Sequence, residues 1–82
     1  MGEEQLISVI SMLRELEEDG SVPKNVKTKV TSTIQALQDS TDTSIKVSRA
    51  LHALEAVAED NNVQSYTRMQ LFNIVSALEM LS

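Results

Sequence analysis

The chain of 82 residues is long enough for one small domain, and a domain of this size buries only about 60% of the surface that its unfolded chain exposes. It contains no cysteine, which excludes disulfide bridges, thiolate metal sites and cysteine nucleophiles. No apolar run approaches the ~20 residues that span a bilayer, and the net charge of −5 opposes a general affinity for nucleic acid or anionic membranes. We therefore expect a soluble cytoplasmic protein that has no membrane segment.

The first predicted helix covers residues 4–19. Its apolar residues recur with the spacing of one helix face: Leu6, Val9, Ile10, Leu13 and Leu16. Gly20 is expected to end this helix, because glycine is common just past a helix C-terminus. Pro23 fits the first turn of a helix but not its interior, so a second helix is predicted at 23–38, with Ser21 near its start as a plausible N-cap.

A run of small polar residues at 38–44 interrupts the pattern and separates the two halves of the chain. A third helix is predicted at 42–60, with Ser40, Thr41 or Asp42 as its cap.

The sequence then returns to a turn like the first one. Asn61 suits a left-handed residue at the end of the third helix, and Asn62 suits a cap before the fourth. The fourth helix is predicted at 64–81. No segment alternates with a period of two over the length of a strand, so no β-structure is predicted.

The two halves repeat with an offset of 41 residues. Several apolar positions coincide at this offset: Leu13 with Leu54, Leu16 with Val57, Val22 with Val63, Val30 with Leu71, Ile34 with Val75, and Leu37 with Leu78. A period of about 40 residues is typical of stacked helical hairpins. The sequence therefore predicts an all-α fold in one domain, 1–82: an antiparallel up-and-down four-helix bundle built from two repeated helical hairpins.

The fourth helix carries more apolar residues than a single buried stripe needs. We predict that part of it forms an interaction surface made of Leu71, Phe72, Ile74 and Leu78. The alternative is that this helix is the most buried one of the bundle. A surface of this kind would serve a homodimer or another, unidentified protein partner.

The basic residues suggest a second surface. If the hairpins stack, one end of the bundle would gather Lys24, Lys27, Lys46, Arg49 and Arg68. Such a patch could hold RNA, although the sequence has no glycine–aromatic motif and few arginines. Lysines that are solvated, or paired with the acidic first helix, are the favoured interpretation.

No catalytic constellation is evident. The single histidine, His52, has no partner histidine for a bundle metal site, and with two glycines the chain has no glycine-rich phosphate loop. The hydroxyl side chains do not sit in a nucleophile motif. We predict no catalytic, metal-binding or cofactor-binding residue, and no small-molecule substrate is indicated.

Two segments carry a resemblance to a known family. DGSVPKNVK at 19–27 and YTRMQLFNIVSALE at 66–79 resemble the small archaeal proteins of uncharacterised protein family 0147, over roughly residues 4–81. The chain departs from the family at Gln64, where proline is frequent. The resemblance implies an all-helical four-helix bundle and a cytoplasmic, archaeal source, and it implies no activity, cofactor or catalytic residue.

The sequence thus favours a non-enzymatic protein-interaction or structural module that either self-associates or binds another protein. The alternative is an accessory RNA-associated or ribonucleoprotein-associated factor that uses the basic end of the bundle.

Overall fold

The computed structural model describes the backbone of residues 2–81 and the side chains of residues 4–81. Within that range there are four helices and no strand: α1 Gly2–Glu18, α2 Lys24–Gln38, α3 Thr43–Ala58 and α4 Ser65–Glu79. Each helix begins and ends within two residues of the position expected from the sequence.

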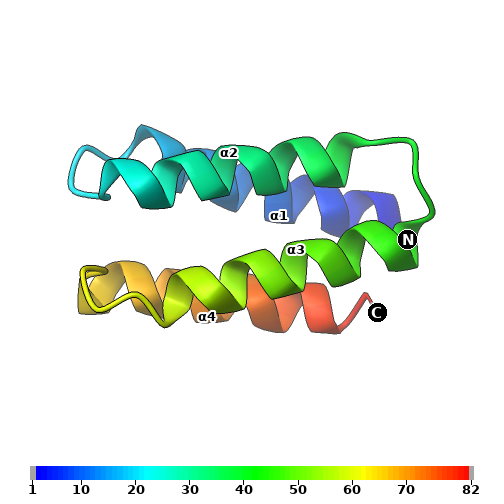
Figure 1. The fold of residues 1–82 in the computed structure, drawn as a ribbon. Coiled ribbons are helices and arrows are strands. Elements are labelled where there is room, and N and C mark those ends of the chain that lie inside the picture. The colour runs from blue at the N-terminus through cyan, green and yellow to red at the C-terminus, as the bar shows by residue number, and fades with distance from the viewer. Residues whose placement is uncertain (1, 82) are drawn as a thin grey trace.

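The four helices run antiparallel to their chain neighbours and form a closed ring in which α4 also packs against α1 (Figure 1). The α1–α2 and α3–α4 turns lie at one end of the rod, which we call the turn end. The α2–α3 connection lies at the opposite end, where α1 begins and α4 finishes. The rod measures 32 × 18 × 18 Å. The predicted up-and-down bundle of two hairpins is confirmed.

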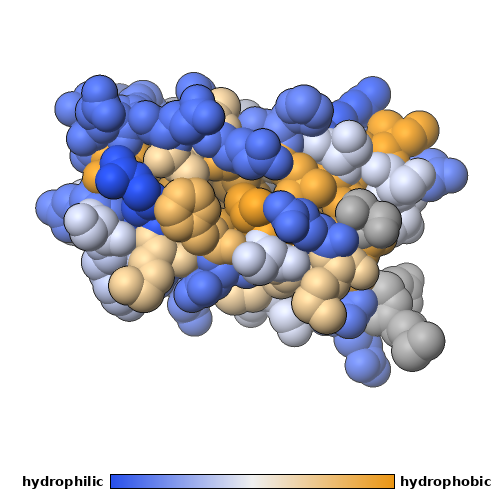
Figure 2. All heavy atoms as spheres, turned by 90° about the horizontal axis from the view of Figure 1, so that it is seen from below, coloured by the Kyte–Doolittle hydropathy of each residue, from blue (hydrophilic) through white to orange (hydrophobic). Residues whose placement is uncertain are grey.

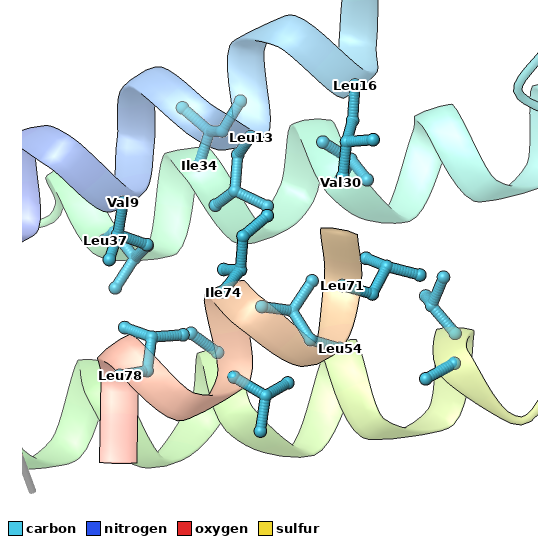
Figure 3. Close-up of a cluster of buried hydrophobic side chains, with 14 of the residues drawn as sticks. Val9, Leu13, Leu16, Val30, Ile34, Leu37, Leu54, Leu71, Ile74 and Leu78 are labelled. Carbon is cyan, nitrogen blue, oxygen red and sulfur yellow. The ribbon is translucent and has the colours of Figure 1, made fainter. Parts of the chain in front are cut away.

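The two halves of the chain contribute equivalent sets of residues to the core. Every buried residue except Ala58 has a buried counterpart 41 residues away. The ten pairs are Leu6/Val47, Val9/Ala50, Leu13/Leu54, Leu16/Val57, Val22/Val63, Val26/Thr67, Val30/Leu71, Thr33/Ile74, Ile34/Val75 and Leu37/Leu78. In Figure 3 labelled side chains from all four helices point into the space between them. The repeat in the sequence is therefore a repeat of inward-facing positions.

The turn after α1 is held by the side chain of Asp19. Its Oδ1 accepts hydrogen bonds from the backbone N–H of Ser21 at 2.9 Å and from the Ser21 hydroxyl at 2.7 Å. The Asp19 carbonyl accepts from the N–H of Val22 at 3.2 Å, and the Val22 side chain is buried under the turn. Aspartate commonly organises turns in this way, by bonding the backbone two residues ahead.

The turn after α3 repeats this arrangement 41 residues later. Asp60 Oδ1 accepts from the N–H of Asn62 at 2.9 Å, and the Asp60 carbonyl accepts from the N–H of Val63 at 3.2 Å. The two turns meet at the turn end, where the Asn25 amide donates to Asp60 Oδ2 at 3.1 Å. This bond links the start of α2 to the turn of the other hairpin.

The structure corrects several expected caps. Ser21 does not cap α2, because its hydroxyl is bound to Asp19 and the N-cap of α2 is Pro23. The N-cap of α4 is Gln64 rather than Asn62. Neither Pro23 nor Gln64 makes a side-chain hydrogen bond to its helix. Asn61 is not left-handed, since none of the described residues has a positive φ.

One expected cap is present. Asp42 caps α3 by accepting hydrogen bonds from the N–H and the hydroxyl of Ser44, both at 3.0 Å. Asp42 was one of three candidates for this position, and it is the one with a carboxylate. A carboxylate also suits the positive end of the helix dipole.

Replacing Gly20 with alanine should leave the fold intact and raise the free energy of unfolding by about 0.4–1 kcal/mol. Gly20 has no positive φ, and a Cβ placed there would meet no heavy atom within 4 Å. Alanine would therefore only restrict the unfolded chain. Urea unfolding of the two proteins measures the difference, and a loss of stability would mean that this turn needs glycine's freedom.

Stability should also fall in acid through Asp19 in the first turn and Asp42 at the start of α3. Hydrogen bonds from the Ser21 N–H and hydroxyl, helped by the charge of Lys27, lower the pKa of Asp19, and the Ser44 N–H and hydroxyl lower that of Asp42. A carboxyl whose pKa is lower in the folded state stabilises the fold fully above its unfolded pKa of about 4. That contribution is lost as the pH falls through the lower folded value.

The matched variant is Asp19→Asn with Asp42→Asn, which keeps an accepting oxygen and removes the titration. Between pH 5 and pH 2 its melting temperature should fall less than that of the wild type. Parallel melting curves against pH for the two proteins would contradict the assignment of the acid response to these two aspartates.

Candidate interaction face on α1 and α4

The inner side of α4 belongs to the core, which corrects the predicted interaction surface. Leu71, Ile74 and Leu78 are all buried to 1% exposure or less, so they cannot form an exposed surface of the folded chain. They lie at i, i+3 and i+7, the spacing of a single stripe that faces the bundle axis. Phe72 is 54% exposed because one residue turns the helix by about 100° away from Leu71.

The outer side of α4 nevertheless carries large apolar side chains. We define the α4 outer face as Tyr66, Met69, Phe72 and Met80, which are 64%, 60%, 54% and 80% exposed. Tyr66 and Phe72 are the two aromatic residues of the protein, so neither aromatic ring is in the core. Figure 2 shows apolar surface along the middle of the α3–α4 side, with a hydrophilic margin above it and mixed apolar and polar side chains below it.

The repeat supplies an internal comparison for this face. The residues of α2 that occupy the positions of Tyr66, Met69 and Phe72 are Asn25, Thr28 and Thr31. The inner sides of α2 and α4 are alike, whereas the outer side of α2 is polar where that of α4 is apolar. The bundle therefore does not require apolar residues at these three positions.

A groove of about 280 Å³ lies beside the α4 outer face, between α4 and α1. Its lining residues are Met12 and Glu15 from α1 and Tyr66, Met69, Gln70, Asn73 and Ile74 from α4. Of the four neighbouring helix pairs, α1 and α4 make the least extensive contact. A groove at this seam follows from that looser packing.

Gln70, which lines the groove, has one polar atom that the chain leaves without a partner. Gln70 Nε2 donates to the Tyr66 hydroxyl at 3.4 Å, while Gln70 Oε1 is buried and has no hydrogen-bond partner. A buried acceptor without a donor costs about 1–3 kcal/mol. A donor from outside the chain would reach this oxygen only after the Gln70 side chain had turned toward the groove.

The charge around the groove is negative. α1 contains five glutamates and one arginine, a net charge of −4, and Glu15 is exposed on the groove. In α4 one glutamate balances one arginine, Arg68. None of the groove-lining residues carries a positive charge.

The predicted basic patch does not form. Lys24, Lys27 and Arg68 lie near the turn end, but Lys46 and Arg49 lie in the first half of α3, toward the opposite end. Lys46 Nζ donates to the Asp39 carbonyl in the α2–α3 connection at 3.1 Å. The up-and-down topology separates these side chains, because consecutive helices begin at opposite ends.

Arg68 has a structural role that the sequence analysis missed. Its Nε donates to the Ala58 carbonyl at 3.1 Å, and its Nη2 donates to the carbonyls of Asp60 at 3.0 Å and Val63 at 3.4 Å. These carbonyls belong to the end of α3 and the turn after it, where a helix lacks backbone donors. The only signal in the sequence was its alignment with Lys27 in the repeat.

The described part of the chain contains neither a metal-ligand cluster nor a membrane-spanning helix. Among its residues no group of three or more histidines, aspartates or glutamates could hold a metal ion, and His52 is exposed on α3. None of the helices described is long and apolar enough to cross a membrane.

Comparison with known proteins agrees with the resemblance found in the sequence. The model of the Uncharacterised protein family (UPF0147) matches residues 1–81. The chain belongs to this family. A UPF0147 protein from Sulfurisphaera tokodaii is 35% identical over 78 residues, covering 94% of this chain and 88% of that protein. A UPF0147 protein from Pyrococcus furiosus is 31% identical over 81 residues, covering 96% and 87%.

A solved structure shares the fold of this UPF0147 chain. The crystal structure of the unknown function protein MMP1188 superimposes with a TM-score of 0.93 at 31% identity, covering 98% of this chain and 92% of that one. The predicted family and fold class are thus both confirmed.

Replacing Arg68 with alanine should lower the free energy of unfolding by about 1.5–3 kcal/mol, the range for hydrogen bonds to a charged group. The matched control is Arg49→Ala, because Arg49 is exposed on α3, and this change should stay within about 0.5 kcal/mol of the wild type. Urea unfolding of the three proteins makes the comparison. Equal effects of the two substitutions would rule out the capping role.

Proposed function

We propose that this UPF0147 protein is a non-enzymatic, cytoplasmic interaction module that docks a partner protein on the α4 outer face and the adjoining groove. The observation that carries the proposal is the divergence of the two hairpins outside the core. Where α2 has Asn25, Thr28 and Thr31, α4 has Tyr66, Met69 and Phe72, all more than half exposed.

The chemistry of these side chains supports docking to a protein. Aromatic residues and methionine are enriched at the centres of protein interfaces, and a tyrosine combines a large apolar ring with a polar tip. Fully burying a side chain of this size is worth about 1.5–3 kcal/mol. The protein forgoes that gain for both of its aromatic residues within its own small core, and a partner that covers the face would recover it.

The RNA alternative loses its expected site, because the basic residues lie toward both ends of the bundle. The same experiment can still detect it if captured material is compared with and without nuclease. Self-association is detected by light scattering on the purified protein.

The decisive variant gives α4 the outer face of α2: Tyr66→Asn, Met69→Thr and Phe72→Thr. We expect the helical circular dichroism spectrum to be retained, since α2 folds with these residues at the same positions. A partner captured from native cells by the tagged wild-type protein should bind this variant at least about 100-fold more weakly, if each side chain contributes roughly 1 kcal/mol.

The matched control is Ile7→Ser. Ile7 is 66% exposed on α1, lies about 140° around that helix from Met12, and has Ser48 as its counterpart in the repeat. It removes an exposed apolar side chain outside the proposed face and should leave capture unchanged. A partner that survives nuclease but binds the triple variant as well as the wild type would refute the proposed function.

A further inference from the structure

We infer that the groove between α1 and α4 receives a lysine or arginine side chain from a basic amphipathic helix of the partner. This inference rests on the proposed function of the α4 outer face and adds the chemical class of the partner. Three features of the groove carry it: the groups that it offers, its size and its charge.

The polar groups of the groove call for a hydrogen-bond donor that bears positive charge. The Glu15 carboxylate is exposed on the α1 side of the groove. On the α4 side Gln70 Oε1 is a buried acceptor with no partner, and a donor in the groove would reach it once the Gln70 side chain turned outward. An ammonium or guanidinium group donates several hydrogen bonds and accepts none. A charge-assisted bond to a carboxylate is also stronger than a neutral one.

The apolar groups suit the rest of such a side chain. Met12 and Met69 line the groove and would cover an aliphatic stem. The exposed ring of Tyr66 beside them offers a face to a cation. The groove volume of about 280 Å³ leaves room for one long side chain.

The surroundings favour a helix as the carrier of that side chain. Tyr66 and Met69 line the groove, and Phe72 continues their row obliquely around α4, about 120° from Tyr66. A helix lying along this row would bury its own apolar residues at i, i+3, i+4 and i+7. A basic residue flanking its apolar stripe would then reach Glu15 at the groove.

The net charge separates this partner from the other candidates. Glu15 on the groove, carried by a helix whose net charge is −4, disfavours RNA and acidic helices at this site. A second copy that docked the same face through a two-fold axis would bring another α1 with −4 against the first. A basic helix is the occupant whose charge is complementary.

The test is a phage-displayed library of amphipathic helices about 18 residues long, five helical turns. Leucines form a fixed apolar stripe, and the positions flanking it vary among Lys, Arg, Glu and Gln. The library is selected on the wild-type protein and counter-selected on the triple variant Tyr66→Asn, Met69→Thr and Phe72→Thr, which keeps only binders of the proposed face.

The enriched helices should carry Lys or Arg at a flanking position. Glu15→Lys should weaken their binding at least about 10-fold, because it places like charges together. The matched control is Asp39→Lys, which changes the net charge equally in the α2–α3 connection and should alter the affinity less than about 3-fold. Selection on Glu15→Lys itself should enrich Glu in place of Lys and Arg.

Enrichment of Glu or Gln on the wild type, equal effects of the two lysine substitutions, or no face-dependent binder at all would each overturn the inference. So would a dimer in solution that the triple variant abolishes, because a second copy would then be the occupant. In all these cases the proposed function still stands if a cellular partner binds the wild type but not the triple variant. If the triple variant binds that partner as well as the wild type does, the proposed function is refuted, whatever the library selection shows.

Discussion

The bundle depends on the burial of an aliphatic core to which both halves of the chain contribute the same set of positions. The two halves place their inward residues at the same positions 41 residues apart, and each pair is buried in both halves. Leu13 and Leu54 on α1 and α3, like Leu37 and Leu78 on α2 and α4, are 2% exposed or less. An 82-residue chain has little core to spare, so these positions tolerate little change.

The core fixes the direction in which every other side chain points. Once Leu71, Ile74 and Leu78 face the axis, helical geometry sends Met69 and Phe72 outward. The turns reinforce this orientation, because the Asp19 and Asp60 carboxylates hold both hairpins in the same geometry and bury a valine under each. The outer positions are consequently free to differ between the halves, and it is there that α2 and α4 diverge.

Most of the fold could be predicted from the sequence, because helix periodicity, the polar break at 38–44 and the repeat all indicate the same architecture. The outer face of α4 could not be predicted by counting apolar residues, since the count mixed inward and outward positions. Aligning α4 with α2 at the offset of 41 separates most of them: Leu71 and Leu78 align with apolar residues, whereas Phe72 aligns with Thr31. Ile74 is the exception, because its counterpart is the buried Thr33.

The prediction of a basic patch was wrong because of the topology of the bundle. Residue type and spacing place Lys46 and Arg49 on α3, but only the up-and-down order of the helices places them away from Lys24 and Lys27. The role of Arg68 depends on three backbone carbonyls that converge only after α3 has packed against α4. Interactions of this kind belong to the tertiary structure and leave no local signature.

The two halves differ in one further respect that bears on function. The counterpart of Gln70 in the repeat is Lys29, and the counterparts of Met12 and Glu15 are Ala53 and Ala56. The α2–α3 seam therefore has small and basic residues where the α1–α4 seam has long, acidic and amide ones. Small domains are stable by only about 5–15 kcal/mol, so a buried amide oxygen without a partner is a substantial fraction of the total. A ligand of the α1–α4 groove would satisfy this oxygen once the Gln70 side chain turned toward it, which links the difference between the seams to the proposed function.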